Sequence, residues 1–109
     1  MKPIVFLGDA LDRLRDFPES AKKEAGVQLH KVQLGMDPSD WKPMTTVGSG
    51  VREIRVREDD GAFRILYVAQ FADAVVVLHA FQKKTQRTEK RDLDLANVRL
   101  RQFRAEGDS

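Results

Sequence analysis

The sequence predicts a single α+β domain, residues 1–109, with a small, mostly antiparallel four-stranded sheet flanked by helices from both ends of the chain. Apolar residues recur at helical spacing near both ends, three stretches between residues 51 and 81 read as strands, and the length of 109 residues suits one domain. The expected order is strand, helix, helix, three strands, helix. We expect the first two helices on one face of the sheet and the last helix at the other face or edge.

The N-terminal part is expected to form a short strand and two antiparallel helices. Residues 3–7 read as the strand, which Gly8 ends, and Asp9 is well placed to cap the first helix. Pro18 fits the first turn of the second helix, whose apolar residues fall on one face, and Gly35 supplies its stop.

Residues 36–50 lack a sustained period and are expected to form a connecting loop before an antiparallel meander of three strands. In the first of these strands Ile54 and Val56 alternate with charged residues, and Asp59-Asp60-Gly61 is typical of a hairpin turn. The third strand is apolar on both faces, which predicts a place at the buried centre of the sheet. We expect the strands at Val51–Glu58, Ala62–Gln70 and Ala74–Phe81.

The closing helix is expected to begin after Thr88, which would cap it, with Glu89 in its first turn. One face of this helix carries an apolar stripe that would pack on the sheet. The stripe consists of Leu93, Ala96, Leu100 and Phe103.

The composition excludes several kinds of site. The chain has no cysteine, so disulfides and thiolate metal sites are excluded, and two histidines are too few for an ordinary structural zinc site. We therefore expect neither a metal nor another cofactor. The N-terminal apolar run is four residues long, too short for a signal peptide or a membrane span, so we expect a cytoplasmic protein.

The net charge is only +2, but the positive charge lies in the middle of the chain. Residues 1–41 carry six basic and seven acidic groups, residues 42–91 carry ten and six, and residues 92–109 carry three and four. A local basic field concentrates phosphate groups whatever the total charge, so this asymmetry indicates an anionic partner.

Within this central region the basic residues fall on neighbouring segments of the meander. Such an arrangement predicts a continuous cationic cleft, with Phe81 and Tyr67 available to stack on bases. The alternative is a set of ordinary solvated or ion-paired charges, as when Arg52 pairs with Glu53 or Glu58. The basic residues are Arg52, Arg55 and Arg57 on the first strand, Arg64 on the second, and Lys83, Lys84, Arg87, Lys90 and Arg91 after the third.

Three segments resemble the signature of phage Gp49-like, HigB-type toxins of the RelE/ParE superfamily. The segment beginning at Leu78 is the most specific of the three, and the resemblance spans nearly the whole chain. The segments are Val51-Arg52-Glu53-Ile54-Arg55-Val56, Gly61-Ala62-Phe63-Arg64-Ile65-Leu66-Tyr67, and Val77-Leu78-His79-Ala80-Phe81-Gln82-Lys83-Lys84-Thr85-Gln86.

The resemblance implies a RelE-like fold and the toxin of a type II toxin-antitoxin system, a metal-independent endoribonuclease that cleaves messenger RNA on the ribosome. The partner it implies is a helix-turn-helix antitoxin. By position, Arg64 matches the catalytic strand arginine of the superfamily, Arg55 matches a basic strand residue, and Lys83 matches a basic residue just after the last strand. The C-terminal catalytic tyrosine of RelE has no counterpart here, because the corresponding place is near Glu89.

RNA cleavage without a metal needs a proton acceptor, cations that stabilise charge on the phosphorane, and a proton donor. His79 is the candidate for proton exchange because its ordinary pKa lies near neutrality; the alternative is a hydrogen-bonded structural histidine. The expected catalytic residues are Arg64, His79, Lys83, Arg55 and Lys84, and the expected RNA-binding residues are Arg52, Arg57, Phe81, Arg87 and Lys90.

Treating Arg64 as exposed, we expect Arg64→Ala to abolish toxicity with little change in thermal stability. Two other functions stay open. ParE-like relatives share the architecture but inhibit DNA gyrase without cleaving RNA, and a phage-derived nucleic-acid-binding protein without toxicity would also carry a basic cleft.

Overall fold

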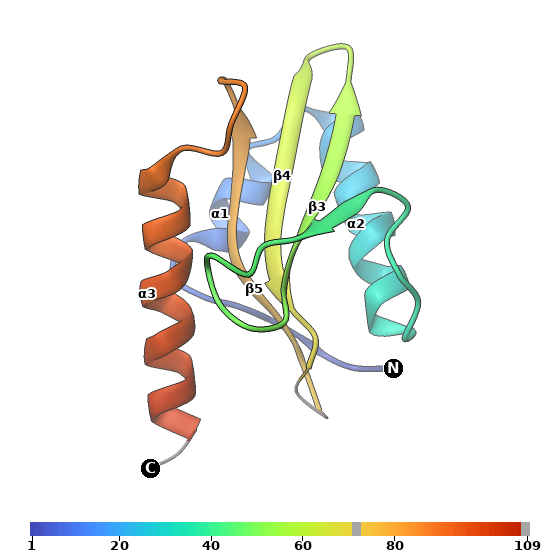
Figure 1. Ribbon diagram of the computed structural model, residues 1–109. Helices are drawn as coiled ribbons and strands as arrows, with labels where there is room; N and C mark the ends of the chain where they lie inside the picture. Colours follow the sequence, from blue (N-terminus) through green and yellow to red (C-terminus); the bar gives the residue numbers. More distant parts are fainter. Residues whose placement is uncertain (71–72, 108–109) are drawn as a thin grey trace.

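The computed structural model describes residues 1–70 and 73–107, which form a mixed five-stranded sheet with three helices (Figure 1). This architecture confirms the α+β class and the predicted helices. The elements are β1 (Ile4–Phe6), α1 (Ala10–Arg15), α2 (Glu19–Gln33), β2 (Trp41–Pro43), β3 (Val51–Glu58), β4 (Gly61–Val68), β5 (Val75–Lys83) and α3 (Lys90–Gly107).

The strand order is β1-β5-β4-β3-β2, with β1 parallel to β5 and every other pair antiparallel. The meander of β3, β4 and β5 is therefore confirmed, but the expected count of four strands is wrong. The fifth strand is β2, which lies inside the segment expected to be a loop and pairs Trp41 with Ile54. Three residues are too few to show an alternating pattern, so this strand depends on its pairing with β3 rather than on a local signal.

The hairpin between β3 and β4 confirms the predicted turn. Glu58 pairs with Gly61 across a two-residue connection, and Gly61 has a φ of +134°. Only glycine adopts such a backbone without strain.

Between β4 and β5 the register shifts once, because Leu66 pairs with His79 while Tyr67 pairs with Val77. Leu78 is thus an extra residue, a β-bulge that puts two consecutive side chains on one face. As a result His79, Phe81 and Lys83 share the face that β3 lines with charged residues.

Two apolar cores cover the two faces of the sheet. α1 and α2 pack on one face against residues such as Ile54, Ile65 and Val77, and α3 packs on the other against residues such as Leu66 and Leu78. Figure 1 shows this arrangement, with α3 on one side of the sheet and α1 and α2 on the other. The predicted placement of the helices is confirmed. β5 is an inner strand and is buried from Val75 to Phe81, as expected, but the middle strand of the sheet is β4.

The helix ends agree with the sequence in part. α2 ends in a Schellman motif, in which Met36 N donates to Lys31 O and Gly35, with a φ of +85°, donates to Val32 O. Asp9 occupies the N-cap position of α1 but makes no side-chain cap, because its carboxylate pairs with Arg99 instead.

The expected Thr88 cap of α3 is wrong. The helix begins at Lys90, and the carbonyl of Glu89 accepts from the amides of Asp92 and Leu93. The Thr88 hydroxyl donates to Glu53 on β3 at 2.8 Å. Glu89 and not Thr88 therefore immediately precedes the helix, and the hydrogen bond of Thr88 to the buried carboxylate fixes the segment before α3 to the sheet.

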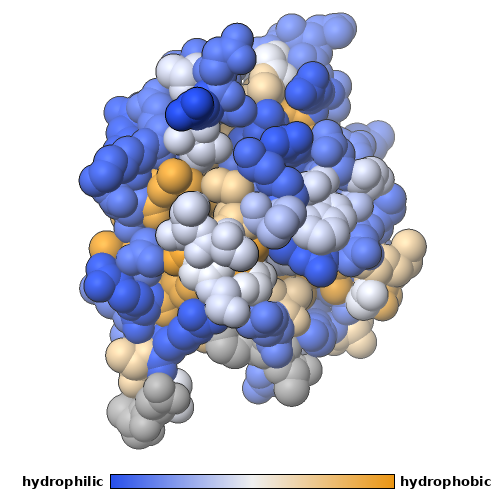
Figure 2. Space-filling view, viewed as in Figure 1, coloured by the Kyte–Doolittle hydropathy of each residue, from blue (hydrophilic) through white to orange (hydrophobic). Residues whose placement is uncertain are grey.

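On the face viewed in Figure 2, hydrophilic side chains cover most of the surface and apolar ones appear in a band beside α3. Among the helices of the described residues, none has the length and apolar content needed to cross a membrane.

Candidate functional site

The charged residues of β3 meet β4 and β5 on the face that α3 covers only in part. Glu53 lies in register with Leu66 and, beyond it, His79, and Arg55 lies in register with Arg64 and, beyond it, Phe81. The apolar residues of α3 pack over the other half of this face. The charged rows are therefore left at the end of the sheet where β5 continues into the segment before α3.

A buried carboxylate lies at the centre of these rows. Glu53 is fully buried, and its Oε1 lies 3.5 Å from Arg64 Nε and 3.7 Å from Arg55 Nε. Its Oε2 accepts the hydrogen bond from Thr88. One carboxylate thus faces two guanidinium groups, which leaves the positive charge in excess.

Arg64 is buried, with 2% of its surface exposed, and its Nη1 donates to the carbonyl of Phe63 at 3.0 Å. Burial lowers the pKa of the Arg64 guanidinium, the charge of Glu53 opposes that shift, and Arg55 adds to it. An arginine stays protonated even so. The expectation that Arg64 is an exposed residue is therefore wrong: it is a charged part of the interior, held by Glu53.

Lys83, at the end of β5, adds a third cation. Partial burial lowers the pKa of the Lys83 ammonium, and the nearby guanidinium of Arg64 lowers it further, while Glu53 opposes the shift. The Lys83 ammonium therefore lies close to Glu53 and Arg55, the same charged groups that act on Arg64. We call Arg55, Arg64 and Lys83 the cationic cluster; together with Glu53 it holds three positive charges against one negative charge.

His79 lies behind this surface and is 1% exposed. Its Nε2 lies 2.8 Å from Asp92 Oδ1 on α3, and its ring stacks on Phe81 with centroids 5.0 Å apart. Burial lowers the pKa of His79, although the hydrogen bond to Asp92 opposes that shift. Its Nδ1 has no hydrogen-bond partner among the described residues. A neutral ring that donates from Nε2 to the Asp92 carboxylate fits these contacts, because a proton on Nδ1 would be buried without an acceptor.

The position of His79 corrects its expected role. A ring with 1% of its surface exposed, its accessible nitrogen already bonded to Asp92, cannot exchange a proton directly with RNA. The alternative considered from the sequence, a hydrogen-bonded histidine, describes the contacts.

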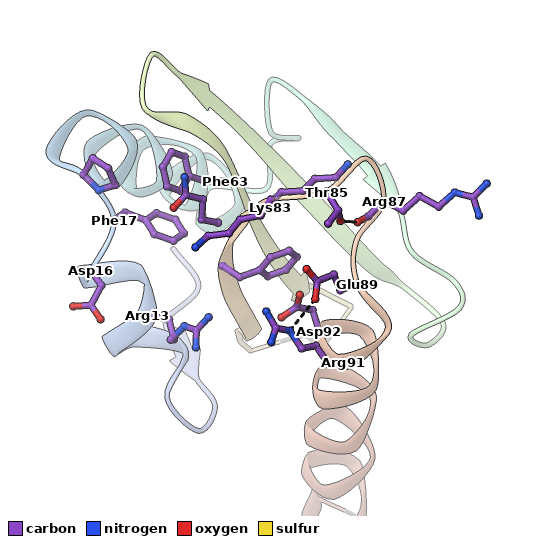
Figure 3. A pocket seen from close by; sticks show the side chains of 14 residues that line it. Arg13, Asp16, Phe17, Phe63, Lys83, Thr85, Arg87, Glu89, Arg91 and Asp92 are labelled. Carbon is purple, nitrogen blue, oxygen red and sulfur yellow. Dashed lines mark hydrogen bonds and ion pairs between the residues drawn. The ribbon is translucent and has the colours of Figure 1, made fainter.

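A pocket of about 260 Å³ opens beside this site, along the part of β5 that β1 does not cover. β1 pairs only with residues 75–77, so the later half of β5 has no strand on that side. Figure 3 shows the pocket between α1 and the start of α3. It is lined by Arg13, Asp16, Phe17, Pro18, Phe63, Phe81, Gln82, Lys83, Lys84, Thr85, Arg87, Glu89, Arg91 and Asp92.

The structure brings most of the predicted site residues together. Arg55, Arg64 and Lys83 form the cationic cluster, and exposed Arg57 is close enough to lower the pKa of Arg64. The pocket lining includes the predicted residues Phe81, Lys84 and Arg87.

Two predicted RNA-binding residues lie apart from the site. Arg52 points to the α2 face, where it pairs with Asp37 at 2.8 Å and stacks over Trp41 at 3.9 Å. The alternative of an ion-paired Arg52 is therefore confirmed, but its partner is Asp37 and not Glu53 or Glu58. Lys90 is exposed on α3 and pairs with Asp94 at 3.1 Å.

Three residues of the site were not found from the sequence: Glu53, Asp92 and Arg13. Glu53 alternates with arginines along its strand. This pattern indicates an ion pair on the surface, but it does not indicate that the carboxylate is buried. Asp92 and Arg13 give no local signal, because α1 and α3 meet the pocket only through the fold.

Comparison with protein families identifies a match over most of the chain. The family model for the phage-derived Gp49-like proteins (DUF891) matches residues 12–101, which include the cationic cluster and the pocket. The search of curated proteins finds no match. Since the model covers most of the chain, the protein belongs to the phage-derived Gp49-like family.

Proposed function

We propose that this protein is the toxin of a type II toxin-antitoxin system and a metal-independent endoribonuclease that cleaves messenger RNA on the ribosome. The observation that carries the proposal is the cationic cluster, in which three positive charges converge with one buried carboxylate. Such an excess of fixed positive charge is suited to a phosphate group and to the charge that grows on it during cleavage. Membership of the Gp49-like family agrees with the resemblance of the sequence to toxins.

The reaction proposed is attack of the ribose 2′-oxygen on the adjacent phosphorus. The bond to the 5′-oxygen breaks, so the products are a 2′,3′-cyclic phosphate and a free 5′-hydroxyl. Lys83 and Arg55, which are partly exposed, contact the phosphate oxygens in this proposal. Arg64, which is buried, acts as a positioning residue through Glu53 and adds to the local field.

Two groups serve the proton transfers. Asp92 lines the pocket with 13% of its side chain exposed, and His79 holds one of its oxygens. We assign to Asp92 the proton of the 2′-hydroxyl, with His79 as the residue that orients it. Lys83 gives a proton to the leaving 5′-oxygen, a role that its lowered pKa favours.

The proposed partners follow from the charge of the site. Messenger RNA in the ribosome is the substrate, and a helix-turn-helix antitoxin neutralises the toxin by placing acidic and apolar residues over the cationic cluster or against the helices. Complementary charge speeds such an association, and buried apolar anchors set the lifetime of the complex. Both encounters place the protein in the cytoplasm.

The test is induction of the gene in growing bacteria, followed by mapping of transcript ends on translating ribosomes. Wild type should arrest growth and cut transcripts only while translation initiates, and Asp92→Asn should lower the cleavage rate about 10²-fold to 10⁴-fold. The matched control is Asp94→Asn, which removes an exposed carboxylate two residues away and should cleave like wild type.

Three outcomes contradict parts of the proposal. Equal cleavage of naked RNA removes the dependence on the ribosome. Growth arrest with intact transcripts and loss of DNA supercoiling indicates a gyrase inhibitor instead. Free growth without any antitoxin gene shows that this chain is not a toxin.

A further inference from the structure

We infer that the pocket beside β5 receives one base of the RNA, and that Arg13 on α1 contacts that base. This inference rests on the proposed function. It adds a subsite beside β5, on the side of that strand that faces away from β4. Lys83 belongs both to this pocket and to the cationic cluster, so the two are adjacent.

The size and the apolar lining of the pocket suit a single flat ring. Its volume of about 260 Å³ lies below the ~300–1,000 Å³ typical of sites for drug-sized ligands. Phe17, Phe63 and Phe81 line it, with the rings of Phe17 and Phe63 packed at 4.8 Å between centroids. The three side chains are 7%, 1% and 3% exposed, so they offer an RNA base an apolar wall rather than open faces for stacking.

The polar rim distinguishes a base from a bare phosphate. The lining carries both cations and carboxylates, and on the α1 side Arg13 can donate and Asp16 can accept. A base presents both acceptors and donors along its edge, whereas a phosphate presents acceptors alone and would be repelled by the carboxylates. Figure 3 shows Arg13 on α1 pointing across the pocket toward Arg91 and Asp92 at the start of α3.

The cationic cluster next to the pocket can bind the phosphate of the nucleotide whose base enters the pocket. Lys83 lines the pocket and also senses the charges of Arg64 and Arg55, so a nucleotide with its phosphate at Lys83 can direct its base toward the phenylalanines. The pocket is open at this side because β1 ends its pairing at Val77. A nucleotide therefore enters without any movement of the sheet.

The experiment is an NMR titration of the full chain with nucleoside 3′-monophosphates and, separately, with ribose 5-phosphate, which has no base. Nucleotides should shift the amides of Arg13, Phe17 and Phe81, and ribose 5-phosphate should shift only those near Lys83. Arg13→Ala should weaken nucleotide binding about tenfold, the usual loss for a hydrogen bond from a charged donor, and leave ribose 5-phosphate binding unchanged.

The matched control is Arg15→Ala, which removes an exposed arginine of the same helix that does not line the pocket. It should bind nucleotides like wild type. Equal binding by the Arg13→Ala and Arg15→Ala variants, or equal shifts with and without a base, overturns the inference. If wild type cleaves messenger RNA and Arg13→Ala keeps the same base preference, only the subsite fails. If nucleotides bind as described but wild type does not cleave, the proposed enzymatic function fails.

Discussion

At the scale of single residues, burial decides what each charged group can do. Glu53 and Arg64 look from the sequence like surface charges on neighbouring strands, yet both lie in the interior and neutralise one another. Lys83 comes from the same charged surface but stays partly exposed. A cation that is fully enclosed shapes the field of a site, whereas one at its edge can touch a substrate.

The first prediction concerns this difference. Arg64→Ala leaves the Glu53 carboxylate buried opposite Arg55 alone, and breaking a buried pair costs about 3–5 kcal/mol. For a domain of this size each kcal/mol lowers the midpoint by roughly 4–8 °C. Calorimetry should therefore show a large fall in the Tm of Arg64→Ala. Lys83→Ala is the control and should keep the Tm of wild type while losing cleavage. An unchanged Tm for Arg64→Ala would restore the view from the sequence that this residue is exposed.

The second prediction concerns His79. Its folded-state pKa is lowered below the value of about 6.5 that it has in the unfolded chain. The unfolded state therefore binds more protons as the pH falls below about 6.5, and the free energy of unfolding decreases with a slope of up to about 1.4 kcal/mol per pH unit. Above that pH the residue contributes no pH dependence.

Urea unfolding at pH 7.5 and at pH 5.5 measures this effect. Wild type should be less stable at the lower pH, and the difference should shrink in His79→Gln. His30 is exposed on α2, so His30→Gln should keep the full pH dependence. If both glutamine variants behave alike, His79 does not carry the titration.

At the scale of elements, the sequence predicts what repeats and misses what is short or irregular. The alternation of β3 and the Asp59-Asp60-Gly61 turn identify the hairpin because several residues contribute to each signal. β2 has three residues, and the bulge at Leu78 has no sequence pattern of its own. The bulge nevertheless decides which face Phe81 and Lys83 occupy.

The candidate site shows the same division. The convergence of Arg55, Arg64 and Lys83 follows from the order of the strands and was predictable. The burial of Arg64 depends on the Thr88 segment and on Glu53, which one strand alone does not reveal. The contributions of Arg13 and Asp92 depend on how α1 and α3 flank β5, so no local pattern could indicate them.

The third prediction uses a glycine inside α2 and the glycine just after its end, which have different backbones. Gly26 lies inside the helix with open space where a Cβ would stand, so Gly26→Ala should stabilise the fold by about 0.5–1 kcal/mol. Gly35 also has open space, but its φ of +85° suits only glycine, and Gly35→Ala should destabilise by about 1–2 kcal/mol. Chemical denaturation measures both. Two changes of the same sign would show that the Schellman motif does not limit this helix.

At the scale of the whole molecule, charge is distributed by face and not by total. A protein with a net charge of +2 spread evenly over its surface would bind RNA weakly. Here the cationic cluster and the pocket bring together cations from β3, β4, β5 and the segment before α3. On the opposite face, which α2 covers, the charge of Arg52 is neutralised by its ion pair with Asp37. One face of the molecule is therefore suited to a polyanion.

The fourth prediction follows from this asymmetry. Binding of single-stranded RNA should weaken linearly with the logarithm of salt concentration, and Lys83→Ala should reduce the slope by about 0.7, the value for one phosphate contact. Lys23, exposed on α2, supplies the control, and Lys23→Ala should leave the slope unchanged. Fluorescence anisotropy over a range of salt measures both. Equal slopes for the two variants would place the RNA elsewhere.

The parallel pairing of β1 with β5 has a consequence for how the chain is made. β1 is synthesised first, and its partner residue Val75 follows Ile4 by about 70 residues. At roughly 5–20 residues per second, the first strand waits several seconds for its neighbour to leave the ribosome. During that interval α1 and α2 have no finished sheet to cover. Because β5 borders both apolar cores, its arrival completes the core under α1 and α2, and the second core closes only when α3 follows. The nascent chain therefore gains its structure late in synthesis.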